Sequence, residues 1–287
     1  MANEVKNENQ TIVGSFDVFN GKYVGEWRDG SPNGEGVLTT DDFDVYEGTF
    51  FYGNLHGKGS VSFFDGDVYE GDWQKGLFHG FGIYTYANGK RYEGEWRDDR
   101  KNGFGILTSP DGDRYEGIWK DGGLEGHGIH IHKNGDRYEG NFKGGAEGGH
   151  GILVRANGDR YEGAFHNGRF SGEGVYIYAN GDRYEGEYLH GKRQGRGVFT
   201  YAKGDVFEGD WRNDMLHGYG RWAFADGRVL EGLFTDGMPS GYVVLTLADG
   251  GVYRGGFENG RLHGEGEFTR PDGTVQKGTW ENGKFVG

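Results

Sequence analysis

Two histidines are the residues of this chain whose type and spacing come nearest to metal chemistry. His130 and His132 stand two residues apart in the stretch HGIHIH, so a strand would point both imidazoles to one face. Such a pair can chelate Zn²⁺ or Cu²⁺. However, no acidic residue or cysteine joins them in a recognised spacing, and most equivalent stretches carry Leu, Val, Tyr or Phe at the position of His130. We therefore expect packing, with no metal ion and no cofactor.

A regular column of arginines is the second set of charged residues with chemical potential. Each arginine is followed two residues later by a glutamate on the same face. A basic stripe could contact phosphoinositide head groups, but a ladder of solvated pairs, each contributing little, is the plainer interpretation. The column consists of Arg91, Arg114, Arg137, Arg160 and Arg183.

Residues for catalysis lack the asymmetric arrangement that an active site needs. The chain has no cysteine, hence no thiol nucleophile and no disulfide. It contains no G-x-S-x-G and no phosphate-binding loop. Aspartates and glutamates recur at equivalent positions, so no carboxylate pair is singled out. We predict that the protein is not an enzyme.

The amino-acid composition limits the classes of partner that the protein can bind. The 287 residues include 61 Gly, 18 Tyr, 20 Phe and 7 Trp, and the net charge is −14. An acidic chain is repelled by phosphate backbones and by anionic lipid surfaces, so we expect no nucleic acid, and membrane contact is not favoured. The polar start MANEVKNENQ lacks a signal core, and no run of 18 apolar residues occurs. These features predict a cytoplasmic protein.

The elements that must position these side chains are encoded by an internal sequence repeat. The phrase NGDRYEG stands at 134–140, 157–163 and 180–186, and its tyrosine column recurs every 23 residues from Tyr23 to Gln276. A glycine follows two residues later in all twelve copies, and an aromatic residue follows four residues later in all twelve. Further glycines lie seven, eleven and thirteen residues after the tyrosine. Internal repetition therefore determines the fold.

The alternation of tyrosine, glycine and ring with charged residues has the period of a strand. A glycine-containing turn, a second strand-like run such as 80–86, and Asn-Gly or Asp-Gly follow, which is a strong hairpin signal. The sequence predicts an all-β, elongated, single-layer antiparallel meander, a solenoid of about twelve hairpins. We expect rings of one hairpin to lie flat over the bare glycine backbone of a neighbour.

These columns resemble the MORN repeat (membrane occupation and recognition nexus), Y-E-G-x-W-x-x-G-x-x-H-G-x-G at a period of 23. Residues 73–82 and 253–266 match closely, and the resemblance covers about residues 11–287. Leu230 and Gln276 replace the ring at the tyrosine position, and Asp99 and Asp214 replace a loop glycine.

The predicted organisation is a disordered tail at 1–10, a capping strand at 11–22 and one elongated repeat array at 23–287 whose last copy is incomplete. Unpaired edge strands favour self-association, so a homodimer through the edges or the groove is one expected partner.

A long ring-lined groove is typical of a protein-binding surface, because aromatic residues dominate interface energetics. The resemblance implies a non-enzymatic scaffold that binds proteins of a cytoskeletal assembly, such as a radial spoke of a cilium or flagellum, or the cell cortex. The expected groove residues are those of the middle repeats: Tyr92, Trp96, Tyr115, Trp119, Tyr138, Phe142, Tyr161, Phe165, Tyr184 and Tyr188.

Two alternatives stay open. The family's link to phospholipids implies a membrane-tethering module, which here would rest on the arginine column and be weakened by salt. A regulatory module acting on a partner enzyme is the other. We further hypothesise that the atypical residues Arg221, Trp222, Met238 and Pro239 carry partner specificity.

Overall fold

The computed structural model describes residues 11–287, so the predicted disordered tail at 1–10 lies outside the described residues. Every regular element within them is a β-strand. The described part of the chain holds no helix that could cross a membrane. Contacts divide the chain into two compact units, one ending at Ala146 and the other beginning at Glu147. The prediction of a single elongated array remains untested.

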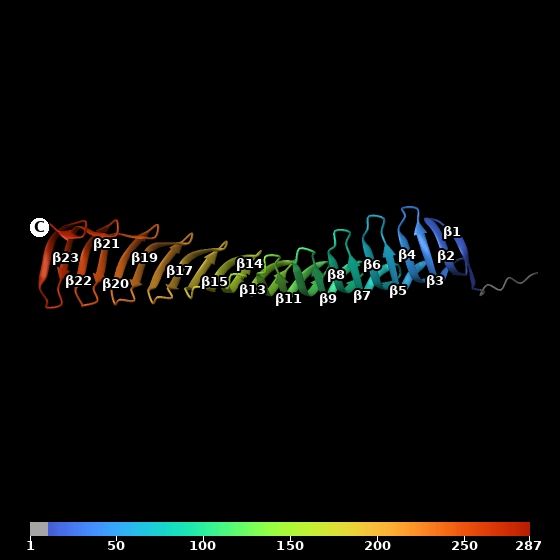
Figure 1. Cartoon of the computed structure of the whole chain (residues 1–287), viewed down its shortest axis with the longest axis horizontal. Helices are drawn as coiled ribbons and strands as arrows, with labels where there is room; N and C mark the ends of the chain where they lie inside the picture. Colours follow the sequence, from blue (N-terminus) through green and yellow to red (C-terminus); the bar gives the residue numbers. More distant parts are fainter. Residues whose placement is uncertain (1–10) are drawn as a thin grey trace, which may run out of the picture. The chain divides into compact units, whose positions relative to one another are not determined.

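The first unit contains twelve complete strands, coloured blue to green in Figure 1. They are β1 (Ile12–Val18), β2 (Gly21–Arg28), β3 (Ser31–Thr40), β4 (Val45–Phe51), β5 (Asn54–Ser62), β6 (Val68–Gln74), β7 (Leu77–Thr85), β8 (Arg91–Arg97), β9 (Arg100–Thr108), β10 (Arg114–Lys120), β11 (Gly123–Ile131) and β12 (Arg137–Lys143).

The second unit holds the remaining strands, the first of which begins at the boundary residue Ala146. They are β13 (Ala146–Val154), β14 (Arg160–His166), β15 (Arg169–Ile177), β16 (Arg183–Leu189), β17 (Lys192–Thr200), β18 (Val206–Arg212), β19 (Met215–Ala223), β20 (Val229–Thr235), β21 (Met238–Thr246), β22 (Val252–Glu258), β23 (Arg261–Thr269), β24 (Val275–Glu281) and β25 (Lys284–Phe285).

Within each unit the strands form an antiparallel meander, in which every strand pairs with the next one along the chain (Figure 1). Among residues 11–287 no helix or second sheet covers it. The predicted all-β meander of 23-residue hairpins is confirmed. The first strand, β1, pairs with β2, and the ring of Phe16 stacks on Trp27 at 4.4 Å; its capping role stays a prediction.

Rows of facing glycines run across the strands. Gly94 of β8 faces Gly82 of β7 on one side and Gly105 of β9 on the other. A Cβ built on Gly94 would lie 2.5 Å from the Cα of Gly105. Just beyond Gly94 the register of β8 and β9 shifts by two residues, from Gly94 opposite Gly105 to Trp96 opposite Lys101, which is a bulge in the ladder. Side chains are therefore excluded where each hairpin bends.

The glycine thirteen residues after each repeat's first tyrosine, here called the floor glycine, lies under that tyrosine's ring. A Cβ built on the floor glycine Gly105 would stand 2.3 Å from the Tyr92 hydroxyl oxygen. Tyr92 Oη also donates a hydrogen bond of 3.1 Å to the carbonyl of Glu95, which faces Phe81 of β7 but is left without a partner in β9 by the bulge. The tyrosine thus covers the floor and satisfies a carbonyl that the bulge frees.

The second ring of each repeat covers the floor glycine of the preceding repeat. Trp96 Nε1 donates to the carbonyl of Gly82 at 3.2 Å, and Trp119 Nε1 donates to that of Gly105 at 3.0 Å. The prediction that rings lie over a neighbour's glycine therefore holds for the second ring, whereas the tyrosine covers a glycine of its own repeat. Both kinds of ring form the core.

Candidate protein-binding site

The rings predicted to line an open groove are core residues, which corrects the expectation of an exposed surface. They pack edge to face, as Tyr92 does against Trp96 at 5.2 Å and Trp119 at 5.3 Å. The glycine floor beneath them and the neighbouring rings beside them leave no room for a partner. Nine of the ten are at most 6% exposed: Tyr92, Trp96, Trp119, Tyr138, Phe142, Tyr161, Phe165, Tyr184 and Tyr188.

Tyr115 is the tenth ring, and it is half-buried. Leu124 takes its place over the floor, because a Cβ on Gly128 would lie 3.0 Å from the Leu124 side chain. The displaced Tyr115 ring stacks on His130 with centroids 3.9 Å apart.

The arginine column forms the ladder of pairs that the plainer interpretation predicts. Each guanidinium lies beside the glutamate two residues on, at 2.5 to 2.7 Å, and both partners are partly exposed. The stripe therefore presents alternating charges and no row of unpaired cations. The pairs are Arg91–Glu93, Arg114–Glu116, Arg137–Glu139, Arg160–Glu162 and Arg183–Glu185.

A lysine lies inside the ring layer of the first unit, and sequence reasoning missed it. Lys101 Nζ stands 5.0 Å from the ring centroid of Tyr92, 5.1 Å from that of Trp119 and 5.4 Å from that of Tyr86. Burial, aided by the charge of Lys90, lowers the pKa of the Lys101 amine to about 8. The ring faces attract the ammonium but do not replace its lost hydration.

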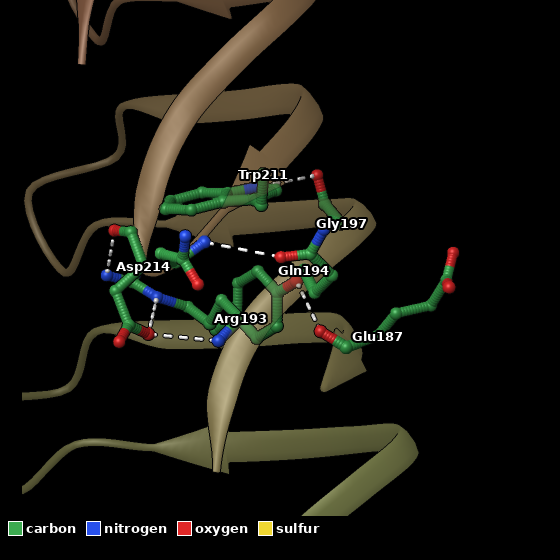
Figure 2. A network of polar contacts seen from close by, with 8 residues as sticks. Glu187, Arg193, Gln194, Gly197, Trp211 and Asp214 are labelled. Carbon is green, nitrogen blue, oxygen red and sulfur yellow. Dashed lines mark hydrogen bonds and ion pairs between the residues drawn. The ribbon is translucent and has the colours of Figure 1, made fainter. Parts of the chain in front are cut away.

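An arginine occupies the equivalent position in the second unit, with a carboxylate beside it (Figure 2). The Arg193 guanidinium lies 4.3 Å from the Trp211 ring centroid, and its Nε donates to Asp214 Oδ1 at 3.3 Å. Trp211 Nε1 in turn donates to the carbonyl of Gly197 at 3.3 Å. Arg193 is thus held by a ring and a carboxylate together.

The two aspartates that replace a loop glycine have a structural role. Asp99 Oδ1 accepts a hydrogen bond of 2.7 Å from the backbone N–H of Phe78, and Asp214 Oδ1 accepts one of 2.9 Å from that of Arg193. Both aspartates have positive φ, 63° and 70°. Each fastens a loop to the preceding hairpin at the cost of local backbone strain.

An open cavity of about 420 Å³ lies in the second unit, over β19 to β23 and the Gly283 turn. Its walls are mostly apolar, and two arginines stand among them. The lining consists of Trp222, Phe224, Arg228, Leu230, Pro239, Leu245, Phe257, Gly260, Arg261, Leu262 and Gly283. A larger cavity of about 680 Å³ near Lys58 and Glu70 is lined largely by small and charged residues.

The apolar cavity forms where the ring layer is interrupted. Leu230 stands at the tyrosine position, and Val243 stands at the position of the floor glycine. The Val243 side chain fills the floor that a ring covers elsewhere, as it lies 3.0 Å from a Cβ built on Gly232. Pro239 stands nine residues after Leu230, where seven other repeats carry Phe or Leu. The smaller side chains leave the cavity open.

Trp222, one of the residues that line the cavity, has an indole N–H that is unpaired within residues 11–287. Its Nε1 is buried and has no hydrogen-bond acceptor among the described residues. Its ring is stacked between Tyr201 and Phe224, at 6.1 and 5.2 Å. Buried donors are nearly always paired in proteins, so this N–H requires an acceptor.

The two arginines of the wall differ in their pairing. Arg228 lies over the Phe224 ring at 4.8 Å and is paired with Asp226 at 2.8 Å. Arg261 is in no ion pair with any residue that the structure describes.

Only two of the four atypical residues lie at the cavity. Trp222 and Pro239 line the cavity. Arg221 lies outside it and is paired with Glu231 at 3.5 Å, and Met238 is 64% exposed at the start of β21. Sequence reasoning therefore identified two of the lining residues but missed the arginines. The sequence signal for the cavity was the loss of both the ring and the floor glycine in one repeat.

The chain belongs to the MORN-repeat family. The family model "MORN repeat" matches eleven consecutive segments. Together they cover most of the residues from Tyr23 to Val275, so the resemblance drawn from the columns is confirmed. The segments are 23–45, 46–68, 69–91, 92–114, 115–137, 138–160, 161–183, 184–206, 207–227, 231–252 and 253–275.

Similar solved structures are remote. The TCP10 domain of Danio rerio CPAP, in complex with a peptide of Danio rerio STIL, has a TM-score of 0.40 and 16% identity, over 77% of this chain and 93% of that one. The SAS-4 (dCPAP) TCP domain of Drosophila melanogaster, with a proline-rich motif of Ana2, has a TM-score of 0.35 and 15% identity, over 62% and 90%. Both similarities are too weak to carry function to this chain. No curated protein sequence matches it.

Proposed function

We propose that this chain is a non-enzymatic scaffold and that the apolar cavity over β19 to β23 is where a partner protein docks. The observation that carries the proposal is an open, mostly apolar cavity of about 420 Å³ in a chain where most ring positions are buried. Concave apolar sites with few polar groups are the usual form of a binding site. Family membership supports the scaffold class.

The chemistry of the walls indicates the kind of segment that fits. Leu245, Phe257 and Leu262 offer contacts for an apolar side chain. The guanidinium of Arg261 suits a carboxylate. We therefore propose an extended partner segment with an apolar anchor and an adjacent acidic residue.

The cytoskeletal setting remains part of the proposal. The resemblance supports a ciliary or flagellar axoneme, or the cell cortex, and with it a cytoplasmic location. Homodimerisation through the edge strands is compatible with this function. No observation favours phospholipid binding, because the arginine column is paired with its own glutamates.

The test uses photo-cross-linking in cells that express the full chain. A photoreactive residue replaces Pro239 in the cavity wall or, as the control, Phe104, which is 48% exposed on the other unit. The proposal predicts one partner protein cross-linked from position 239 and absent from position 104. That partner, once purified, should bind the full chain with little dependence on salt.

Flotation on phosphoinositide vesicles at two salt concentrations gives the opposing result. Salt-sensitive flotation that is lost in Arg114→Glu, together with no cross-link at position 239, would overturn the scaffold proposal in favour of lipid tethering.

A further inference from the structure

Three potential metal ligands from two turns converge in the first unit. Asp113 immediately precedes β10, His130 lies near the end of β11, and His132 follows that strand. Each offers one ligand atom, and these atoms all lie within 4.8 Å of one another. His130 Nε2 is 3.0 Å from Asp113 Oδ1, and the two imidazole centroids are 3.6 Å apart. The spacing of the histidines in the sequence did not reveal the carboxylate.

The equivalent positions in other repeats separate what the fold needs from what is added here. Tyr176 donates to Asp159 at 2.7 Å in the same way that His130 contacts Asp113, and Tyr178 stands where His132 does. A phenol is therefore sufficient for the hydrogen bond to the turn. Neither packing nor that bond requires two imidazoles, and this repeat alone in the sequence carries them at both positions.

The burial of the three groups suits coordination. His130 is 7% exposed and is held in place by the stacked ring of Tyr115. Asp113 and His132 are half-buried, so they leave an approach for an ion from solvent. A rigid inner ligand with two more accessible ones is a favourable start for a site, because little side-chain freedom is lost on binding.

We propose that Asp113, His130 and His132 bind a divalent transition-metal ion of the zinc type. Two imidazole nitrogens and one carboxylate oxygen are the donor set of open zinc sites, in which water takes the fourth position. The ligand atoms must approach to about 3.4 Å from one another to meet zinc bond lengths of about 2.0 to 2.2 Å. Coordination through Nε2 of His130 replaces its hydrogen bond to Asp113 and uses the tautomer that carries its proton on Nδ1.

The ion would join the turn before β10 to the end of β11. Since the ligands come together only in the folded chain, the ion binds the folded state and stabilises it. The bound ion would thus cross-link two consecutive hairpins of the first unit.

The test is calorimetric titration of the metal-free full chain with ZnCl₂. The expected result is one zinc ion per chain, with affinity reduced at least tenfold in the double variant H130Y/H132Y. That variant reproduces the pair Tyr176 and Tyr178, so it retains the hydrogen bond to Asp113 and should fold. Saturating zinc should raise the melting temperature of the wild type and leave that of the double variant unchanged.

Two further variants keep the result interpretable. H132Y alone replaces a half-buried side chain and should weaken zinc binding even if H130Y disturbs the packing. The control is H263N, which removes an imidazole that also lies beside a carboxylate, Glu258 at 3.5 Å, but has no second imidazole near it. Equal affinity in wild type and H130Y/H132Y, loss in H263N, or no zinc binding by the wild type would each overturn the proposal.

Discussion

Repeats 184–206 and 230–252 lie in the same unit and follow the same register, yet one is packed shut and the other is open. In the first, Tyr184 covers the floor glycine Gly197, whose added Cβ would lie 2.3 Å from the hydroxyl oxygen. In the second, Leu230 and Val243 replace the ring and the floor glycine, and Leu230 lines the open cavity.

This difference shows that ring and floor must change together. A ring needs a bare backbone beneath it, and a branched side chain on the floor needs a smaller neighbour above it. The regular repeats therefore supply stability, whereas the exchanged pair supplies open apolar surface. We therefore expect binding sites in this fold at repeats where the tyrosine ring and the floor glycine are both replaced.

The largest expected effect comes from breaking the pair in the closed repeat. Gly197→Val places a branched side chain inside the space of the buried Tyr184 ring, and we expect a loss of about 3 kcal/mol in the free energy of unfolding, the upper range of overpacking. Urea denaturation of the full chain would measure it.

The matched variant is Tyr184→Leu/Gly197→Val, which copies Leu230 and Val243 into the closed repeat. It should be more stable than the two single losses added together predict, with a coupling of about 1 to 3 kcal/mol. Strict additivity would mean that ring and floor are independent.

A smaller effect is expected at the loop aspartates, which distinguish the two units. Asp214→Gly removes the bond from the Arg193 backbone and the carboxylate beside the guanidinium, which keeps its bond to the carbonyl of residue 214. Asp99→Gly removes only the bond from Phe78. We expect losses of about 1 to 2 kcal/mol for the first, lowered by the exposure of Asp214, and about 1 kcal/mol for the second. Equal losses measured by denaturation would show that the Arg193 contact contributes nothing.

The lysine in the ring layer predicts a pH dependence that the arginine does not share. The Lys101 amine has a pKa of about 8 when folded and about 10.4 in an unfolded chain, so the unfolded chain binds more protons between these values. Stability should rise with pH through that window, since the cost of burying the ammonium is complete below pH 8.

Lys101→Leu, which copies Leu124, removes this dependence. The stability advantage of the variant over the wild type should shrink as pH rises from 7 to 10. The buried tyrosines, whose pKa values are raised chiefly by burial, should lower the stability of both proteins above about pH 10. Comparing the variant with the wild type at each pH cancels this shared loss. A constant difference between the two proteins would contradict the burial of a charged amine.

The smallest effect is expected on the arginine ladder. Glu93→Gln leaves Arg91 partly exposed and hydrated, so the free energy of unfolding should change by about 0.5 kcal/mol or less. A loss above about 2 kcal/mol in urea denaturation would give the ladder a structural role that its exposure does not support.

Much of the fold could be predicted, because period, glycine and ring columns each follow from local backbone rules that every copy repeats. The site could not. Periodicity identified Tyr184 and its equivalents as ringed positions, but it could not say whether the rings lie open or pack over one another. That depends on the bulge beyond each glycine, such as Gly94, which bends the hairpin and has no sequence signal of its own.

Deviations from the columns were the better guide to chemistry. Trp222 and Pro239 stood out by type and do line the cavity, while Lys101 and Arg193 differ from their column without having been singled out. The carboxylate of Asp113 reaches His130 only through the pairing of two turns, which spacing along the chain does not express.

The most direct test of the account restores the regular pair in the open repeat. Leu230→Tyr/Val243→Gly recreates a ring over a bare floor and should fill the cavity without loss of stability. Its affinity for the partner cross-linked at position 239 would be measured by calorimetry beside that of the wild type and of Glu93→Gln. The account predicts binding at least tenfold weaker in the filled variant and unchanged in Glu93→Gln. Unchanged affinity in a filled and folded variant would contradict it.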